Sequence, residues 1–326
     1  MSGYEWMIDG MTNQDGSQKP LAGRIALVAG ATRGAGRGVA AALGEAGATV
    51  WCTGRTTAAE RSEYDRPETA EQTAEMVTAA GGKGIWRRVD HTDERQVQQL
   101  IQQIEREHGR LDIAVTSLGG EHLHGEWDKP IWEQDVAVGR QMLRGVLEAH
   151  LLTATYALDL VRRTKGGLHI TLTDGDATYN DAHYRINAYF DTIKTSLTRL
   201  AYSLGHELTA HDGTAVAVSP GWLRSEMMLD IFGVSEQNWR DAWTDTPAGE
   251  KAPEDFAVSE SPLFVGRCVA ALAHDPNRGR WNQKSTTSEV LAQEYQVNDI
   301  DGSRPRAWSF ITASEGEPKP DVASYR

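Results

Sequence analysis

Apolar and polar positions alternate in a regular way along most of the chain. A short apolar run at 24–30 is followed by a helical pattern at 34–46 and by a second apolar run at 48–54. Short apolar runs bounded by turn residues are typical of buried strands, and apolar positions three and four apart are typical of helices. This first stretch therefore predicts a strand, a helix and a second strand.

The same alternation continues to about residue 220. Further strands are expected at 84–90, 111–117, 168–173 and 214–220, and helices at about 68–80, 93–108, 132–162 and 185–210. Buried strands connected by helices form a parallel sheet that helices cover on both faces, with right-handed crossovers. The sequence thus predicts an α/β fold with a doubly wound parallel sheet. Ligands in such folds bind at the carboxyl ends of the strands.

Three segments do not follow this alternation. Residues 1–20 form an N-terminal tail, residues 221–259 carry large apolar side chains among acidic ones, and residues 281–326 are polar and rich in turn residues. We expect a single domain over 21–280, which includes 221–259 as a lid over a substrate, followed by a C-terminal extension at 281–326. Packing of 221–259 on the body, with no ligand, is the alternative. The tryptophans of the lid favour a bulky apolar or aromatic substrate.

The charge of the chain limits its partners. The 33 basic and 46 acidic residues give a formal charge of −13, which disfavours binding to nucleic acids and to anionic membranes and favours a small-molecule substrate. The first 20 residues lack the apolar core of a signal peptide, and no apolar stretch approaches the ~20 residues of a membrane span. A cytoplasmic protein is expected. Cys52 and Cys268 indicate neither a disulfide framework nor a zinc site.

Three glycines lie between the first predicted strand and the first predicted helix. Gly30, Gly34 and Gly36 allow a tight turn and a close approach of the backbone to a phosphate, while the start of the helix presents free N–H groups to the anion. Their place directly after a strand favours a dinucleotide site over a glycine turn without a ligand.

The spacing GxxxGxG resembles that of the short-chain dehydrogenase/reductase family, over about Leu21 to Met228. Other matching positions are Asp90, Gly119, Lys194 and the run Ser219-Pro220-Gly221. The resemblance implies a Rossmann-like fold with a nicotinamide cofactor across the strand ends, Lys194 on the nicotinamide ribose, and a homodimer or homotetramer. The expected cofactor-binding residues are Gly30, Thr32, Arg33, Gly34, Ala35, Gly36, Arg55, Thr56, Asp90, His91, Leu118, Gly119, Thr173, Lys194, Pro220, Gly221 and Ser225.

The end of the second strand indicates which nicotinamide cofactor binds. An acidic residue there would hold the ribose 2′-hydroxyl, but the sequence reads T53-G54-R55-T56. Arg55 and Arg33 together can hold a 2′-phosphate. The expected cofactor is NADP(H).

The positions that carry the chemistry of the family differ in this chain. Members usually carry Asn, Ser, Tyr and Lys, of which the tyrosine passes a proton to or from the substrate oxygen. The matching residues here are His150, Asp174, Phe190 and Lys194. Phenylalanine has no proton to give, so the lysine is kept while the acid–base set is changed.

Three accounts of the chemistry stay open. Another group could supply the proton, either Tyr189, turned inward by a one-residue π-bulge, or one of Tyr184, His150 and Asp174. Alternatively, the substrate needs little acid help, as with a protonated imine. The third account is a non-redox protein, either a cyclase or isomerase or a cofactor-responsive binding module. We expect hydride transfer with a carbonyl, alcohol or imine carbon, with Lys194, Asp174, His150, Tyr189 and Tyr184 as the candidate catalytic residues.

Two further patterns lie near these positions. Glu121, His122 and His124 lack the spacing of a metal site, so we expect loops that line a substrate cavity and no metal. Along the last predicted helix, apolar residues three and four apart indicate one buried face, at Phe190, Ile193, Leu197, Leu200, Leu204 and Leu208.

Overall fold

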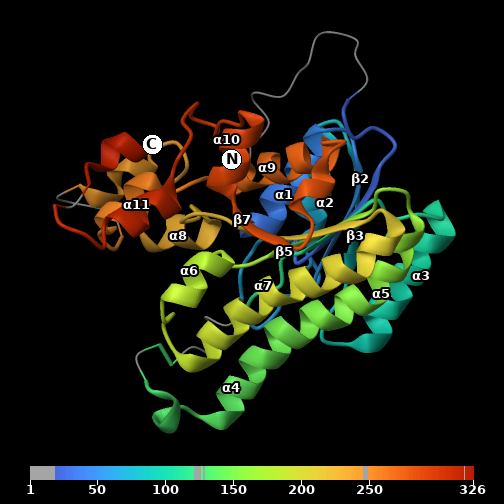
Figure 1. Ribbon diagram of the computed structural model, residues 1–326, viewed down its shortest axis with the longest axis horizontal. Helices are drawn as coiled ribbons and strands as arrows, with labels where there is room; N and C mark the ends of the chain where they lie inside the picture. The colour runs from blue at the N-terminus through green and yellow to red at the C-terminus, as the bar shows by residue number, and fades with distance from the viewer. Residues whose placement is uncertain (1–18, 121–125, 128, 245–248, 319) are drawn as a thin grey trace.

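A parallel sheet of seven strands forms the centre of the molecule (Figure 1). The computed structural model describes residues 19–120, 126–127, 129–244, 249–318 and 320–326. The strand order is β3-β2-β1-β4-β5-β6-β7, and every neighbouring pair is parallel. The strands are β1 (Ile25–Ala29), β2 (Thr49–Gly54), β3 (Lys83–Arg88), β4 (Ile113–Thr116), β5 (Leu168–Leu172), β6 (Thr214–Ser219) and β7 (Lys284–Thr287).

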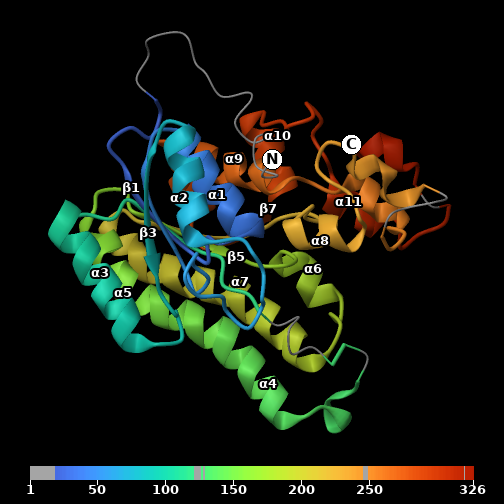
Figure 2. The same ribbon diagram turned by 180° about the vertical axis from the view of Figure 1, so that it is seen from behind.

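Helices cover both faces of this sheet, as Figures 1 and 2 show from opposite sides. On one face lie α1 (Gly34–Glu45), α2 (Ala70–Ala79), α9 (Pro262–His274) and α10 (Ser288–Tyr295). On the other lie α3 (Glu94–His108), α4 (Val136–Leu143), α5 (Ala149–Arg163) and α7 (Ala188–Leu208). A π-helical turn, Arg144–Glu148, joins α4 to α5. The shorter helices are α6 (Ala177–Ala182), α8 (Glu226–Ile231) and α11 (Ala307–Ala313).

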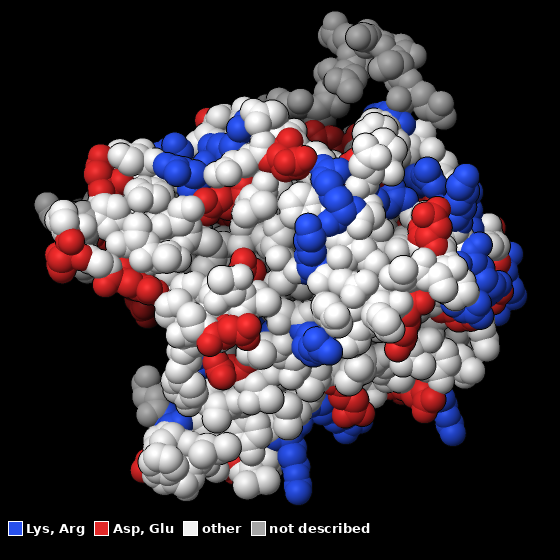
Figure 3. Space-filling view, viewed as in Figure 1, with Lys and Arg blue, Asp and Glu red and all other residues white. Residues whose placement is uncertain are grey.

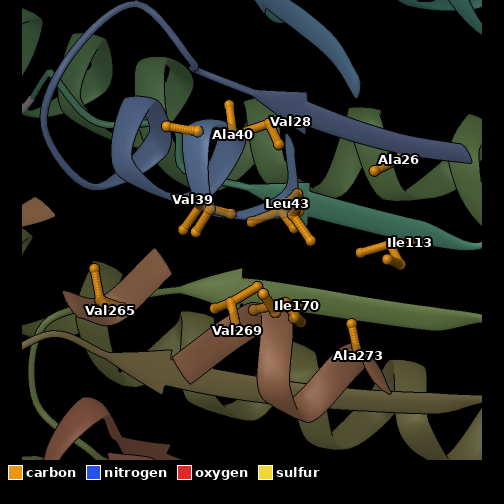
Figure 4. Packing of buried hydrophobic residues seen from close by; sticks show 14 of the residues in the cluster. Ala26, Val28, Val39, Ala40, Leu43, Ile113, Ile170, Val265, Val269 and Ala273 are labelled. Carbon is orange, nitrogen blue, oxygen red and sulfur yellow. The ribbon is translucent and has the colours of Figure 1, made fainter. Parts of the chain in front are cut away.

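Each central strand contributes to two hydrophobic cores because its side chains alternate between the faces. In β1, Ala26 and Val28 pack with α1 and α9, whereas Ile25 and Leu27 pack with α3 and α5. Figure 4 shows the first of these cores, where α1 and α9 meet over the sheet. The predicted doubly wound α/β fold is confirmed.

Local signals fix the ends of several helices. Thr69 and Gln72 form a capping box at the start of α2, and Asp93 caps α3. The Asn187 side chain accepts a hydrogen bond from the Phe190 N–H and so starts α7. The predicted apolar face of α7 is buried along its whole length.

The predicted boundary of the C-terminal extension is wrong in part. Residues 281–326 were expected outside the repeating pattern, but β7 pairs with β6 and α10 packs on α9. Strand β7 is short, polar and at the sheet edge, so its sequence lacks the apolar run of a buried strand. The C-terminal extension, which lies outside the sheet and the helices that cover it, therefore begins only after α10.

The segment 221–259 lies between β6 and α9, as predicted, and its aromatic side chains form a small core of their own. Trp239 is 2% exposed and packs edge-on against Phe256, which also contacts Trp222 and Trp243. Because these tryptophans pack against Phe256 and, for Trp239 and Trp243, against each other, they give no support to the expectation of a bulky apolar or aromatic substrate. The last residues of the chain pack beside this segment through α11, at the left end of Figure 1.

The surface carries both signs of charge. In the view of Figure 3, acidic side chains lie along the end formed by 221–259 and α11, and basic side chains gather at the opposite end. Among the described residues, no helix has both the length and the hydropathy that a bilayer crossing requires. The cytoplasmic location stays a prediction.

Candidate active site

A cavity of about 850 Å³ opens at the carboxyl ends of the central strands. Its walls come from the loops after β1, β2, β3 and β4, from the π-helical turn and from the start of the segment 221–259. This is the edge of a doubly wound sheet where ligands bind. Predicted cofactor-binding residues that line the cavity are Gly30, Thr32, Arg33, Gly34, Ala35, Arg55, Thr56, Asp90, His91, Leu118, Gly119 and Ser225. Those that do not are Gly36, Thr173, Lys194, Pro220 and Gly221.

The glycine loop is built for close approach of the backbone. Gly30 has φ +84°, and a Cβ there would overlap the Ser117 carbonyl at the end of β4. A Cβ at Gly36 would overlap the Gly30 carbonyl. Gly36 therefore lets α1 start directly against the loop, as a dinucleotide cradle requires.

A carboxylate lies at the N-terminus of α1. The Gly34 N–H donates a hydrogen bond of 2.8 Å to the Glu226 carboxylate, and the buried Arg37 guanidinium lies 3.5 Å from the same group. The N-terminus of a helix binds anions through its free N–H groups and its dipole. The Gly34 N–H and the Arg37 guanidinium are thus donors that hold an anionic group here, and donors of this kind fit a phosphate.

Two arginines line the cavity beside the end of β2. The Arg33 guanidinium lies 3.8 Å from the centre of the Tyr64 ring, and Arg55 forms an ion pair of 2.6 Å with Glu63. Burial lowers the pKa of Arg33, an effect that Tyr64 opposes. The predicted pair of arginines thus flanks one end of the cavity, and each has an aromatic or acidic neighbour from the connection between β2 and α2.

The loop after β3 supplies Asp90 and His91. The Asp90 carboxylate accepts hydrogen bonds from the Thr92 N–H and hydroxyl. The His91 ring lies between the hydroxyls of Thr53 and Thr153, 2.9 Å from each, and burial lowers its pKa to about 3. His91 is therefore a neutral side chain that stiffens the wall of the cavity.

The predicted lysine lies beside the phenylalanine that replaces tyrosine. Lys194 Nζ lies 4.9 Å from the centre of the Phe190 ring, and both side chains are buried on α7. The ring of Trp127 meets that of Phe190 edge-on, 5.9 Å away. The Thr173 hydroxyl donates to the Lys194 carbonyl at 3.4 Å, which ties the end of β5 to this turn of α7.

The account in which a π-bulge turns Tyr189 inward is wrong. Helix α7 is α-helical from Ala188 to Leu208, and the Tyr189 ring packs against Gly139 of α4. The described π-helical turn of this region lies instead just before His150. Tyr184 is 69% exposed in the loop before α7. Neither tyrosine takes the place of the missing phenol at Phe190.

His150 and Asp174 are both held by neighbouring groups. His150 is buried, and its Nδ1 lies 2.8 Å from the Val146 carbonyl, to which it donates. The Asp174 carboxylate pairs with Arg185 at 3.0 Å. Arg185 in turn lies over the ring of Trp308 from α11, so the C-terminal extension reaches this side of the molecule.

Several site residues were missed by sequence reasoning. These residues contact the glycine loop, the first helix or the two predicted arginines, and they are Glu63, Tyr64, Arg37 and Glu226. Glu226 follows directly after the predicted Ser225, which is the one signal that could have identified it. The candidates Glu121, His122 and His124 lie outside the described residues.

The family model described as enoyl-(acyl carrier protein) reductase matches residues 30–275. A mouse protein, dehydrogenase/reductase SDR family member 1, is 30% identical over 286 residues, which cover 87% of this chain and 85% of that protein. The chain belongs to the short-chain dehydrogenase/reductase family. Members of this family are oxidoreductases that use nicotinamide cofactors, act on small molecules and commonly form oligomers.

Other similar proteins agree with this assignment. The hydroxynaphthalene reductase arp2 of Aspergillus fumigatus is 28% identical, with 78% of this chain and 87% of that protein covered. A short-chain type dehydrogenase/reductase from Mycobacterium ulcerans has a TM-score of 0.62 and 21% identity, over 82% of this chain and 88% of that one. A Shigella flexneri 2a protein, described as a short chain dehydrogenase complexed with NADP, has a TM-score of 0.63 and 20% identity, over 84% of this chain and all of that one. These two structures share the fold.

Proposed function

We propose that the protein is an NADP(H)-dependent oxidoreductase that moves a hydride between the nicotinamide and a carbonyl, alcohol or imine carbon of a small molecule. The observation that carries the proposal is the carboxylate that the N-terminus of α1 accepts beside the glycine cradle, because the N–H groups that hold it suit a phosphate as well. The match to the reductase family model favours redox chemistry over the non-redox alternative.

The choice of NADP(H) rests on Arg33 and Arg55. Two guanidinium groups beside the end of β2 suit a 2′-phosphate, and no acidic residue ends that strand. The related fold from Shigella flexneri 2a is complexed with NADP, which supports the same choice.

The residues would share the work as follows. The N–H groups at the start of α1 hold the pyrophosphate, Arg33 and Arg55 hold the 2′-phosphate, and Lys194 binds the nicotinamide ribose. The cofactor supplies the hydride chemistry. Asp174 and His150 orient the polar atom of the substrate, and each is itself fixed, by Arg185 and by the Val146 carbonyl.

The missing phenol at Phe190 favours a substrate that needs little acid help. A protonated imine already carries its proton, so its reduction needs no general acid from the protein. Of the two reducible groups, an imine therefore suits the residues present better than a carbonyl, whose reduction calls for a proton donor.

Calorimetry with NADPH and NADH, followed by single-turnover NADPH oxidation with matched carbonyls and imines, tests the proposal. We expect tighter binding of NADPH and faster oxidation with imines. Tight binding without oxidation by any compound would favour the non-redox alternative. Equal or better affinity for NADH would contradict the choice of cofactor.

We also propose a homodimer or homotetramer, as is common in this family. Exposed apolar side chains on α5 and α7, such as Leu151 and Tyr202, support an interface there. Light scattering after size-exclusion chromatography tests this, and a monomer at micromolar concentration would contradict it.

A further inference from the structure

Two carboxylates of the chain itself occupy the anion-binding groups of the cavity. Glu226 lies on the Gly34 N–H and near Arg37, and Glu63 lies on Arg55. Resting on the proposed function, we infer that these carboxylates compete with the cofactor. Glu226 must leave for any nicotinamide dinucleotide to bind, whereas Glu63 must leave only for a 2′-phosphorylated one.

Glu226 is held where it is by more than one contact. It is the first residue of α8, and the Ser225 hydroxyl caps that helix by accepting from the Met228 N–H at 3.4 Å. Its side chain is 16% exposed, and Arg37 beside it is fully buried. A carboxylate and a pyrophosphate cannot share this pair of donors, because like charges at such short range repel strongly. Binding of a dinucleotide therefore requires α8 to shift or its first side chain to turn away.

A second contact ties α8 to the opposite wall of the cavity. Asp230, at the other end of α8, forms an ion pair of 2.7 Å with Arg66, which also pairs with Glu68 at 2.6 Å. Arg66 belongs to the same connection between β2 and α2 that carries Glu63 and Tyr64. The two competing carboxylates therefore sit on segments that are linked to each other.

The contact of Glu63 differs in its consequences. The Glu63 side chain is 48% exposed and that of Arg55 is 33% exposed, so their ion pair is partly solvated and weak. A 2′-phosphate carries more charge and more acceptor oxygens than a carboxylate, so it displaces Glu63 from Arg55. NAD(H) has a hydroxyl at that place and gains nothing from displacing it. Glu63 thus lowers the affinity for NADP(H) and leaves that for NAD(H) unchanged.

The test is calorimetric titration of NADPH and NADH into the full chain and into single variants. Glu226→Gln removes the charge at the start of α1 and is expected to tighten both cofactors about 3- to 10-fold. Glu63→Gln is expected to tighten NADPH about 3- to 5-fold and to leave NADH within twofold. The matched control is Glu60→Gln, on the same connection, whose partner is Arg88 and which does not line the cavity; it should change neither affinity by more than about twofold.

The binding affinities of the variants can contradict each part of the inference separately. Unchanged or weaker binding of both cofactors by Glu226→Gln overturns the competition at α1, and an equal effect of Glu63→Gln on both cofactors overturns the role in specificity. If Glu226→Gln fails to fold in a thermal melt, Asp230→Asn releases α8 from Arg66 and should tighten both cofactors; no change there would also overturn the inference. Binding of neither cofactor by any form, the natural chain included, contradicts the proposed function instead.

Discussion

Lys194 Nζ lies 4.9 Å from the centre of the Phe190 ring, one turn away on the same helix. This geometry is that of a cation over an aromatic face. It also means that a hydroxyl added to that ring would lie in the neighbourhood of a buried ammonium group. Phe190 thus places an aromatic ring beside Lys194 and lacks only the hydroxyl group that a tyrosine would carry there.

Restoring the phenol should therefore raise activity. Phe190→Tyr is expected to increase single-turnover NADPH oxidation by carbonyl compounds about 10- to 100-fold, because a positioned general acid commonly contributes about 10²- to 10⁴-fold. The control Tyr202→Phe, on the exposed side of α7, should leave the rate within twofold. An unchanged rate in Phe190→Tyr, with cofactor binding kept, would show that the chemistry does not pass through this position.

The fold could be predicted from the sequence because most of its strands and the glycine turn depend on residues that are close together in the chain. Strands β1, β5 and β6 are mostly apolar and are buried at every position, and the GxxxGxG turn needs only neighbouring residues. Strand β7 was missed because its sequence, KSTT, is polar, as suits a strand at the edge of the sheet. Its partner β6 ends at Ser219, and β7 starts only at Lys284, so no short pattern links the two.

The site was predictable only in part, for a related reason. Gly30, Arg33 and Arg55 follow strands directly, so topology alone places them at the cavity. Glu226 meets Gly34 across 192 positions of the chain, and no short pattern encodes that contact. A π-bulge near Tyr189 was a condition of one of the three accounts of the chemistry; the π-helical turn instead lies at Arg144–Glu148, where the His150 side chain donates to the Val146 carbonyl.

Enlarging Gly36 should disrupt the cradle. In Gly36→Ala the new methyl group would overlap the Gly30 carbonyl, so the loop must move. Overpacking of this kind costs about 1–3 kcal/mol, and we expect that loss in the free energy of unfolding by urea, together with at least about tenfold weaker dinucleotide binding. Gly279→Ala is the matched control, since no atom lies near its Cβ. Full stability and affinity in Gly36→Ala would contradict the role given to this glycine.

The ion cluster between the segment 221–259 and the chain's last part should contribute strongly to stability. Arg224 is fully buried and pairs with Glu236 at 2.6 Å and with Asp299 at 3.1 Å. Burial raises the pKa of Glu236, although Arg224 opposes that rise. Arg224→Gln removes the only cation that the described residues place on Glu236 and leaves Asp299 with Arg326 alone, 4.0 Å away, which should cost about 3–5 kcal/mol in the free energy of unfolding.

The control for that variant is Arg240→Gln. Its ion pair with Asp301, at 2.8 Å, is exposed on the arginine side, so less than about 1 kcal/mol should be lost. Equal losses in the two variants would mean that burial adds nothing to the Arg224 cluster.

Two buried histidines should make the fold sensitive to acid. Burial lowers the pKa of both His91 and His169 to about 3, from an ordinary value of about 6.5, so both are neutral in the folded chain. Between these two values the unfolded chain binds more protons than the folded one. Stability is therefore complete above about pH 6.5 and falls as the pH decreases towards 3, by about 1.4 kcal/mol per pH unit for each histidine.

His169 offers the direct test of this prediction, because neither of its ring nitrogens has a hydrogen-bond partner in the part of the chain that the structure describes. His169→Leu should be at least as stable as the natural chain at pH 7.5, since an unsatisfied buried polar group is removed. By urea unfolding at pH 7.5 and pH 5.0, the variant should lose about 2 kcal/mol less on acidification. His211→Gln, at an exposed position, should keep the full acid sensitivity. The same acid sensitivity in His169→Leu as in the natural chain would mean that His169 already takes up a proton in the folded state.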